Sequence, residues 1–137
     1  MLRCDVLIIG SGLAGLTSAL KLADHKKVLI VSKREILDSS SQWAQGGVAA
    51  VMSNEDSIES HVKDTEFVGG GLTDPKVANF VASHGKEAIE WLHDLQVPFS
   101  LDESTQQFHL TKEGGHSHRR VVHAKDATGR AIQATLS

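Results

Sequence analysis

The 137-residue sequence lacks most features that mark disulfide-rich, membrane-spanning or nucleic-acid-binding proteins. Its one cysteine, Cys4, cannot form an internal disulfide, so a cytoplasmic location fits best, and we expect Cys4 to be a small core residue. No apolar run approaches the roughly 20 residues that cross a bilayer. The formal net charge of -3 indicates neither a nucleic-acid partner nor a membrane surface.

The two ends of the chain also lack expected features. An apolar run follows the amino terminus at once, which leaves no room for a signal peptide. The last seven residues, 131–137, continue a helical pattern without a capping residue, glycine or proline. We therefore expect the sequence to be the front part of a longer protein.

The most informative segment is an apolar run, Val6–Ile9, that leads into the G-x-G-x-x-G motif Gly10-Ser11-Gly12-Leu13-Ala14-Gly15. A helical apolar pattern and a second apolar run, Val28–Val31, follow. In such a βαβ unit Gly10 makes the turn, Gly12 lets the backbone approach a pyrophosphate, and Gly15 lets the helix pack closely on the sheet. The order predicts an α/β, Rossmann-like dinucleotide-binding domain whose parallel strands are buried on both faces. A tight turn without a ligand is the alternative.

The rest of the chain predicts helices and short strands. We expect a loop over residues 32–47, a strand over 48–52, a helix from Ser57 to the glycines at 69–71, a helix from Asp74, a strand pair over 99–110, a strand at Val121 and Val122, and a final helix capped by Asp126. Gly85 predicts a break in the helix that Asp74 caps and Pro75 begins.

The residues after the second apolar run leave two alternatives open. In many dinucleotide sites an acidic residue at this place holds the ribose hydroxyls. Here Val31 is followed by Ser32-Lys33-Arg34, so Ser32 and Lys33 face the ribose. Lys33 and Arg34 either accept the 2′-phosphate of NADP, or the chain belongs to a flavoprotein lineage without the acidic residue.

Residues 39–47, Ser-Ser-Ser-Gln-Trp-Ala-Gln-Gly-Gly, resemble a loop of the succinate dehydrogenase and fumarate reductase flavoprotein family. The likeness is closest to the L-aspartate oxidase branch, and it extends over residues 5–15, 44–51, 57–62, 110–120 and 124–129. It implies that residues 1–137 form the N-terminal part of an FAD-binding domain, cut before the rest of that domain, a capping domain and a C-terminal helical domain. In this family Ser or Lys commonly follows the second strand.

Carried over residue by residue, the resemblance implies a shell of residues around FAD. Its members are Gly10, Ser11, Gly12, Leu13, Ala14 and Gly15 at the pyrophosphate, Ser32 and Lys33 at the adenosine end, and Ser40, Ser41, Gln42, Trp43, Ala44, Gln45, Gly46 and Gly47 around the flavin. The dehydrogenase branch attaches its flavin to a histidine at the position of Ser40, and no histidine lies between His25 and His61. We therefore expect FAD to be bound without a covalent bond. Alternatively, Gly46 and Gly47 only turn the chain into a strand.

Glu113 and His116 are the candidate catalytic residues. The resemblance places Glu113, which precedes two glycines, near the amino group of the substrate, where it orients that substrate. His116 and His118 contact the substrate or position Glu113. The histidines at 109, 116, 118 and 123 lack the spacing of a closed zinc site and no cysteine joins them, so we expect no metal. Arg119 and Arg120 either bind carboxylates or structure the loop.

The resemblance also implies a reaction. The complete enzyme oxidises L-aspartate to iminoaspartate, passes the electrons to oxygen or fumarate in the first step of de novo NAD biosynthesis, and contacts quinolinate synthase. Residues 1–137 alone are expected to be inactive. The alternatives are a fumarate reductase or succinate dehydrogenase flavoprotein, which Ser40 and Glu113 disfavour, an NADP-dependent reductase, and a non-catalytic FAD-binding fragment.

Overall fold

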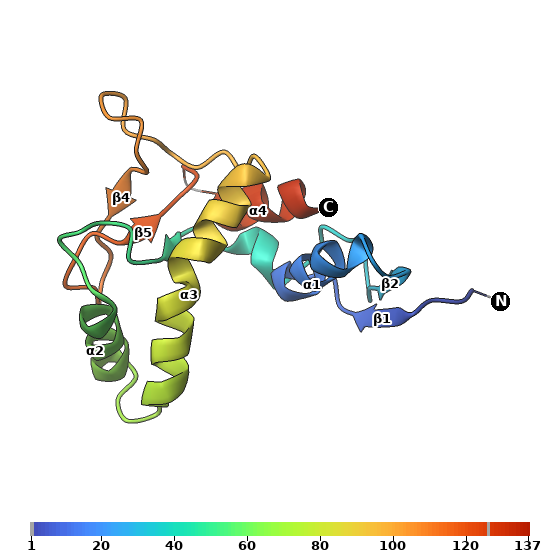
Figure 1. Ribbon diagram of the computed structural model, residues 1–137, viewed down its shortest axis with the longest axis horizontal. Coiled ribbons are helices and arrows are strands. Elements are labelled where there is room, and N and C mark those ends of the chain that lie inside the picture. The colour runs from blue at the N-terminus through green and yellow to red at the C-terminus, as the bar shows by residue number, and fades with distance from the viewer. Residues whose placement is uncertain (1, 126) are drawn as a thin grey trace.

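The computed structural model describes residues 2–125 and 127–137. A parallel strand pair lies at one end of the molecule and a small antiparallel sheet at the other, with helices between them (Figure 1). The elements, in chain order, are β1 (Val6–Ile9), α1 (Leu13–Ala23), β2 (Val28–Val31), the 3-10 helix η1 (Ser40–Trp43), β3 (Val48–Ala49), α2 (Ile58–Val68), α3 (Pro75–Asp94), β4 (Leu110–Thr111), β5 (Val121–Val122) and α4 (Thr128–Leu136).

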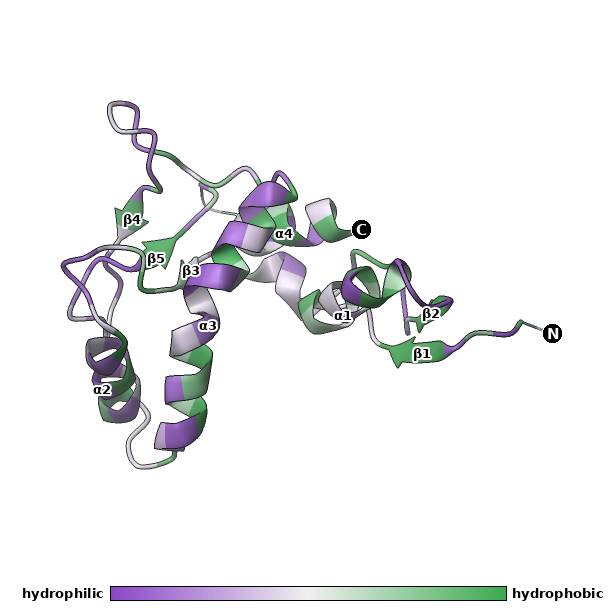
Figure 2. Ribbon diagram, in the orientation of Figure 1, coloured by the Kyte–Doolittle hydropathy of each residue, from purple (hydrophilic) through white to green (hydrophobic). Residues whose placement is uncertain are grey.

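The predicted βαβ unit is confirmed. β1 and β2 pair in parallel, with Val6 opposite Val28, and α1 connects them. The expectation that both faces of these strands are buried is wrong for the described residues, because α1 packs on one face only. Leu7 is 54% exposed and Ile9 is 84% exposed on the other face, which leaves apolar side chains on the surface of both strands (Figure 2).

The second sheet has the strand order β3-β5-β4, with both pairs antiparallel. The strand expected over residues 48–52 is only two residues long, and the loop expected over 32–47 contains η1. The strand pair expected over 99–110 is reduced to one bridge between Leu101 and Phe108. The reason is that the last residues of this segment pair with β5 instead, so that Leu110 lies opposite Val122.

The helix start expected at Ser57 and the helix cap expected at Asp74 are confirmed. The Ser57 hydroxyl accepts from the Ser60 amide, and the Asp74 carboxylate accepts from two amides of the first turn of α3. The break expected at Gly85 is wrong, because α3 runs without interruption from Pro75 to Asp94. A Cβ at Gly85 would lie 3.3 Å from the Cβ of Ala50, so the glycine serves close packing of α3. The predicted cap Asp126 lies outside the described residues.

The core lies between α1, α3, α4 and the antiparallel sheet. Its buried apolar members are Leu16, Ala50, Ile89, Leu92, Val97, Phe99, Val122, Ala124, Ile132 and Leu136. Cys4 is exposed, so the expectation of a core cysteine is wrong. Among the described residues, no helix has the length and apolar character needed to cross a membrane.

Candidate functional site

The glycine motif forms a turn at the N-terminus of α1. Gly10 has a φ of +112°, a conformation that favours glycine, and its amide donates to the carbonyl of Val31 at 2.8 Å. A Cβ at Gly15 would collide with the carbonyl oxygen of Gly10, so Gly15 serves helix–strand packing. A Cβ at Gly12 would have Ser41 Oγ, at 3.7 Å, as its nearest neighbour among the described residues. The Leu13 amide at the start of α1 donates only a long bond, of 3.5 Å, to Ser41 Oγ, and the helix N-terminus is a place that fits a pyrophosphate.

The hydroxyl of Ser11 forms two hydrogen bonds within the protein. Ser11 is 4% exposed, and its Oγ donates to the carbonyl of Ile36 at 3.0 Å. Its single proton is then used, so the Ser32 hydroxyl, also at 3.0 Å, donates to it. Any contact of Ser11 with a phosphate is left to its backbone. The bonded pair of serines instead fixes the end of β2 beside the glycine turn.

A cavity of about 310 Å³ adjoins the end of β2. Its lining residues are Ser32, Lys33, Arg34, Asp38, Ser39, Ser40 and Trp43. The structure thus brings the residues expected at the adenosine end together with the start of the loop expected around the flavin. Arg34 is paired with Asp38 at 3.2 Å, and both side chains are largely exposed.

Gln133 of α4 forms hydrogen bonds with these segments, a role that was not predicted from the sequence. It is fully buried, its Nε2 donates to the carbonyls of Ile36 at 2.8 Å and Ser11 at 3.3 Å, and its Oε1 accepts from Ser39 Oγ at 2.6 Å. A glutamine beside Ile132 on the buried face of a helix is the signal that could have revealed it.

The loop expected around the flavin packs on the start of α4. The carbonyl of Ala44 accepts from the Gly129 amide at 3.0 Å, and a Cβ at Gly129 would collide with the carbonyl oxygen of Ser41. A Cβ at Gly47 would collide with the carbonyl oxygen of Val122, so Gly47 has a packing role beside β5. Trp43 is 70% exposed at the end of η1.

Glu113 lies against this loop. A Cβ at Gly46 would be 3.4 Å from Glu113 Oε2, although the two residues are far apart in the sequence. Both line a cavity of about 560 Å³. Its full lining is Gln45, Gly46, Thr111, Glu113, His123 and Lys125. Two of the residue groups singled out in the sequence, the Gln45–Gly47 segment and Glu113, therefore share one cavity.

The side chain of His116 points elsewhere. Its backbone amide donates to the carbonyl of Glu113 at 3.2 Å, but its ring packs edge-on against His61 of α2, with the centroids 5.9 Å apart. His116 is not a lining residue of the cavity that holds Glu113. Burial and the nearby Arg120 lower the pKa of His61, which favours a neutral ring there.

Arg120 is a buried residue that binds two carboxylates of its own chain. Its Nε and Nη2 each lie 2.8 Å from an oxygen of Asp56, and its Nη1 lies 2.7 Å from Asp64. Burial opposes ionisation of Asp64, but hydrogen bonds from Ser117 and Arg120 outweigh it and lower its pKa to about 2. Of the two sequence hypotheses for Arg120, the structure favours the one in which it structures the loop. His118 joins this cluster at 3.4 Å from Asp56.

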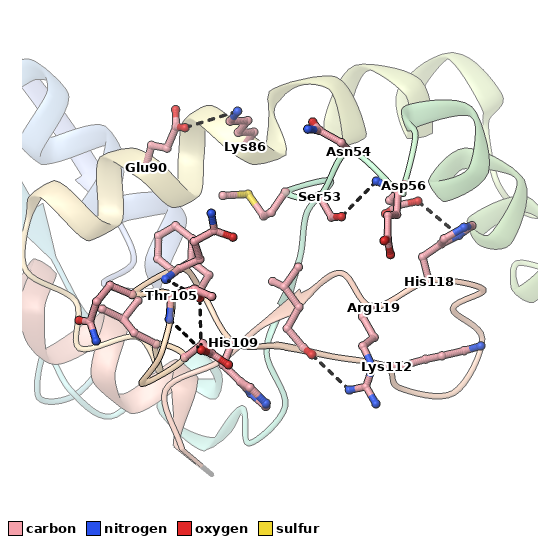
Figure 3. Close-up of a pocket in the computed structure, with 18 of the residues that line it drawn as sticks. Ser53, Asn54, Asp56, Lys86, Glu90, Thr105, His109, Lys112, His118 and Arg119 are labelled. Atoms are coloured by element: carbon pink, nitrogen blue, oxygen red, sulfur yellow. Dashed lines mark hydrogen bonds and ion pairs between the residues drawn. The ribbon is translucent and has the colours of Figure 1, made fainter.

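A further cavity, of about 970 Å³, was not expected from the sequence. It lies between α3, the hairpin near Thr105 and the segment before α2, and Figure 3 shows Lys86 and Glu90 paired with each other on α3, with Lys112 and Arg119 on the opposite side. Its lining combines charged side chains with apolar ones such as Met52 and Phe108. Among the residues that the structure describes, no group of three or more His, Cys, Asp or Glu side chains is arranged to hold a metal ion.

Comparisons with known proteins match these features. A family model described as FAD binding domain matches residues 5–137. The chain is 52% identical to L-aspartate oxidase 1 of Ralstonia nicotianae over 133 residues, which are 96% of this chain and 25% of that protein. It is 50% identical to the L-aspartate oxidase of Vibrio cholerae over 138 residues, which cover 98% of this chain and 26% of that protein.

The chain is also similar in structure to solved flavoprotein-family structures of about 30% identity. An E. coli quinol fumarate reductase FrdA variant superposes with a TM-score of 0.92 at 30% identity, over 98% of this chain and 23% of that chain. Mycobacterium smegmatis Sdh1 in complex with UQ1 superposes with a TM-score of 0.91 at 29% identity, over 97% of this chain and 23% of that chain. The chain spans about a quarter of the length of the curated relatives it matches.

Proposed function

This chain belongs to the FAD-binding domain family, and on that premise we propose that it is the amino-terminal part of an L-aspartate oxidase. FAD is the cofactor of this family, which decides against the NADP alternative. Because the relatives are about four times longer, we infer that the rest of the FAD-binding domain, a capping domain and a C-terminal helical domain follow Ser137.

The proposed reaction is the oxidation of L-aspartate to iminoaspartate, with the electrons passed to oxygen or fumarate. FAD, when bound, supplies the redox chemistry by accepting a hydride from the substrate Cα. The protein supplies binding, orientation and charge. The amides of Gln45, Gly46 and Gly47 stabilise negative charge at the polar edge of the flavin, and Glu113 orients the substrate through its ammonium group.

The observation that carries this proposal is the approach of Glu113 to Gly46 within one cavity. Succinate is a dianion without a cation, whereas aspartate adds an ammonium group. A carboxylate beside the loop that approaches the flavin favours a substrate with an ammonium near the reacting carbon. The same carboxylate disfavours succinate, which supports aspartate oxidation over the fumarate reductase alternative.

We also propose where the pyrophosphate and the adenosine end of FAD bind, on the basis of the glycine turn. The pyrophosphate lies on the amides of Gly12, Leu13 and Ala14 at the N-terminus of α1, and Lys33 lies at the adenosine end. The residues from Ser40 to Gly47 contact the flavin and its linker. The residue at position 40 is a serine, which cannot form the histidyl bond to flavin of the dehydrogenase branch, so the FAD is bound without a covalent bond.

Two further assignments rest on the resemblance to the L-aspartate oxidase branch. We place the protein in the cytoplasm, which agrees with a single exposed cysteine. We also propose a contact with quinolinate synthase, which consumes the iminoaspartate product.

The test uses the complete protein that carries this sequence. Anaerobic addition of L-aspartate should bleach the flavin absorbance, and succinate at the same concentration should leave it unchanged. Acid precipitation should release all of the yellow colour into the supernatant. Bleaching by succinate but not by aspartate would assign the protein to the fumarate reductase branch, and colour retained in the pellet would contradict non-covalent binding.

A further inference from the structure

Two histidines that flank the paired strands β4 and β5 are hydrogen-bonded to each other. Nδ1 of His109 and Nε2 of His123 lie 2.9 Å apart, and the ring centroids are 5.2 Å apart at an interplanar angle of 78°. Leu110 pairs with Val122, so His109 and His123 are the next opposed positions along the ladder. At this distance one nitrogen carries the shared proton and the other accepts it.

The backbone of Ser100 holds the two histidines in place. Its carbonyl accepts from the amide of His109 at 2.9 Å, and its amide donates to the carbonyl of His123 at 2.8 Å. The Ser100 hydroxyl also accepts from the Lys125 amide at 3.3 Å. Backbone hydrogen bonds to Ser100 therefore fix the position of both histidines.

The two histidines line two different cavities. His123 is half-buried and lines the cavity that contains Glu113 and Gly46. His109 is exposed and lines the larger cavity on the other side of the strands. The bond between the rings uses Nε2 of His123 and Nδ1 of His109, so Nδ1 of His123 and Nε2 of His109 take no part in it.

Oxidation of an amino acid requires such a route for a proton. The substrate ammonium must lose one proton before the nitrogen lone pair can form the C=N bond as the hydride leaves Cα. The Glu113 carboxylate serves as the counter-ion to the ammonium, so a second group has to carry this proton away. His123 lines the same cavity as Glu113.

We propose that His123 and His109 form a proton relay between the substrate cavity and solvent, an inference that rests on the proposed oxidation of aspartate. Nδ1 of His123 accepts the proton that the ammonium loses, and the proton on Nε2 of His123 passes to Nδ1 of His109. His109 then releases the proton on its Nε2 to water. Both rings start and end neutral with exchanged tautomers, and exchange with water restores the starting tautomers after product leaves.

Charged groups of both signs line the two cavities beside the histidine pair. Lys125 and Glu113 line the cavity with His123, so one positive and one negative group face this ring. The groups that line the larger cavity with His109 include Lys86, Glu90, His93, Asp102, Lys112, His118 and Arg119.

The test compares His109→Gln and His123→Gln in the complete protein with the control His84→Gln. Glutamine keeps a hydrogen-bonding amide but cannot carry a proton at neutral pH. His84 is an exposed histidine of α3 whose Nδ1 is 2.7 Å from the carbonyl of Phe80, remote from the cavity of Glu113. The readouts are FAD content, the Kd for L-aspartate and the rate of anaerobic flavin reduction as a function of pH.

We expect both relay variants to retain FAD and aspartate affinity, and to reduce the flavin at least about tenfold more slowly near neutral pH. Added imidazole should restore the rate of His109→Gln, because the replaced ring faces solvent. Rates and pH profiles equal to those of the control would overturn the relay, as would the absence of any effect of imidazole.

A measurement on the unmodified protein keeps the proposal testable if a variant loses its flavin. The dependence of the reduction rate on the D₂O fraction should be curved, since at least two protons move together, and a linear dependence would contradict the relay. If aspartate does not reduce the unmodified protein at all, the proposed function and the relay fail together. If it does and the variants behave as the control, only the relay fails.

Discussion

The hydroxyl of Ser39 donates a 2.6 Å hydrogen bond to Oε1 of Gln133, which joins the loop before η1 to the buried face of α4. The amide of Gln133 donates in turn to the carbonyls of Ile36 and Ser11. One buried side chain thus holds the glycine turn, the segment after β2 and the start of the loop near the flavin in fixed relation. The shape of the proposed cofactor site depends on a residue outside the shell expected from the sequence.

Replacing Gln133 by leucine should weaken both the fold and FAD binding. The change keeps the approximate size but removes the partner of the Ser39 hydroxyl and of the Ser11 carbonyl, whereas the Ile36 carbonyl keeps its bond from Ser11 Oγ. Each unsatisfied buried group costs about 1–3 kcal/mol. We expect a lower melting temperature and a higher Kd for FAD, measured by thermal unfolding and flavin fluorescence. Gln107→Leu changes an exposed glutamine and is the control. Equal behaviour of the two variants would contradict the connecting role.

Two glycine substitutions should separate cofactor space from packing. Gly12 has a φ of −72° and room for a Cβ, which would be in ordinary contact with Ser41 Oγ at 3.7 Å. Gly12→Val should therefore fold but lose FAD, because the branched side chain occupies the place of the pyrophosphate. Gly15→Ala should destabilise the fold itself, because its Cβ meets the Gly10 carbonyl. Flavin content and the melting temperature of each variant measure this. Normal flavin content in Gly12→Val would place the pyrophosphate elsewhere.

In the complete protein, Glu113→Gln should impair aspartate oxidation and largely spare fumarate reduction, since fumarate has no amine. Loss of one charge-assisted hydrogen bond of about 1.5–3 kcal/mol lowers kcat/KM for aspartate roughly ten- to a hundredfold. Steady-state kinetics with both substrates measure the ratio. Glu103→Gln, on an exposed turn, is the matched control. Equal losses for both substrates would assign Glu113 a structural or flavin-linked role.

Arg120→Met should be strongly destabilising, whereas the neighbouring Arg119→Met should not. Removing the guanidinium leaves Asp56, whose side chain is 1% exposed, as an uncompensated buried charge. Breaking a buried pair in this way costs about 3–5 kcal/mol. Arg119 is exposed and bonds only the Leu110 carbonyl, at 3.4 Å, among the described residues. Denaturant unfolding of both variants gives the comparison, and similar losses would show that burial of Arg120 is not decisive.

Asp64 should make stability fall in acid. Its pKa is lowered from 3.8 to about 2 in the folded protein, so the unfolded chain binds more protons between these values. The stabilisation is complete above pH 3.8 and is lost as the pH falls toward 2. Asp64→Asn should be less stable at neutral pH and show a shallower decline in acid than the exposed control Asp24→Asn. An unchanged slope would refute the contribution of Asp64.

Local patterns in the sequence were sufficient for the βαβ unit and for the helix caps at Ser57 and Asp74. The run Val6–Ile9 followed by glycines allows few other conformations, and a cap depends only on amides two or three residues away. These features are decided by neighbours along the chain, so the sequence alone determined them. The family resemblance likewise followed from contiguous motifs.

Only the tertiary structure decided what lies between distant segments. Gly85 does not break α3, because helix packing against Ala50 favours continuity over the local preference of glycine. The approach of Glu113 to Gly46 and the pairing of His109 with His123 both depend on the register of β3, β4 and β5. The register of the strands and the burial of side chains are set by the free energy of the whole packed chain. A short segment of sequence does not contain the contacts that determine this free energy.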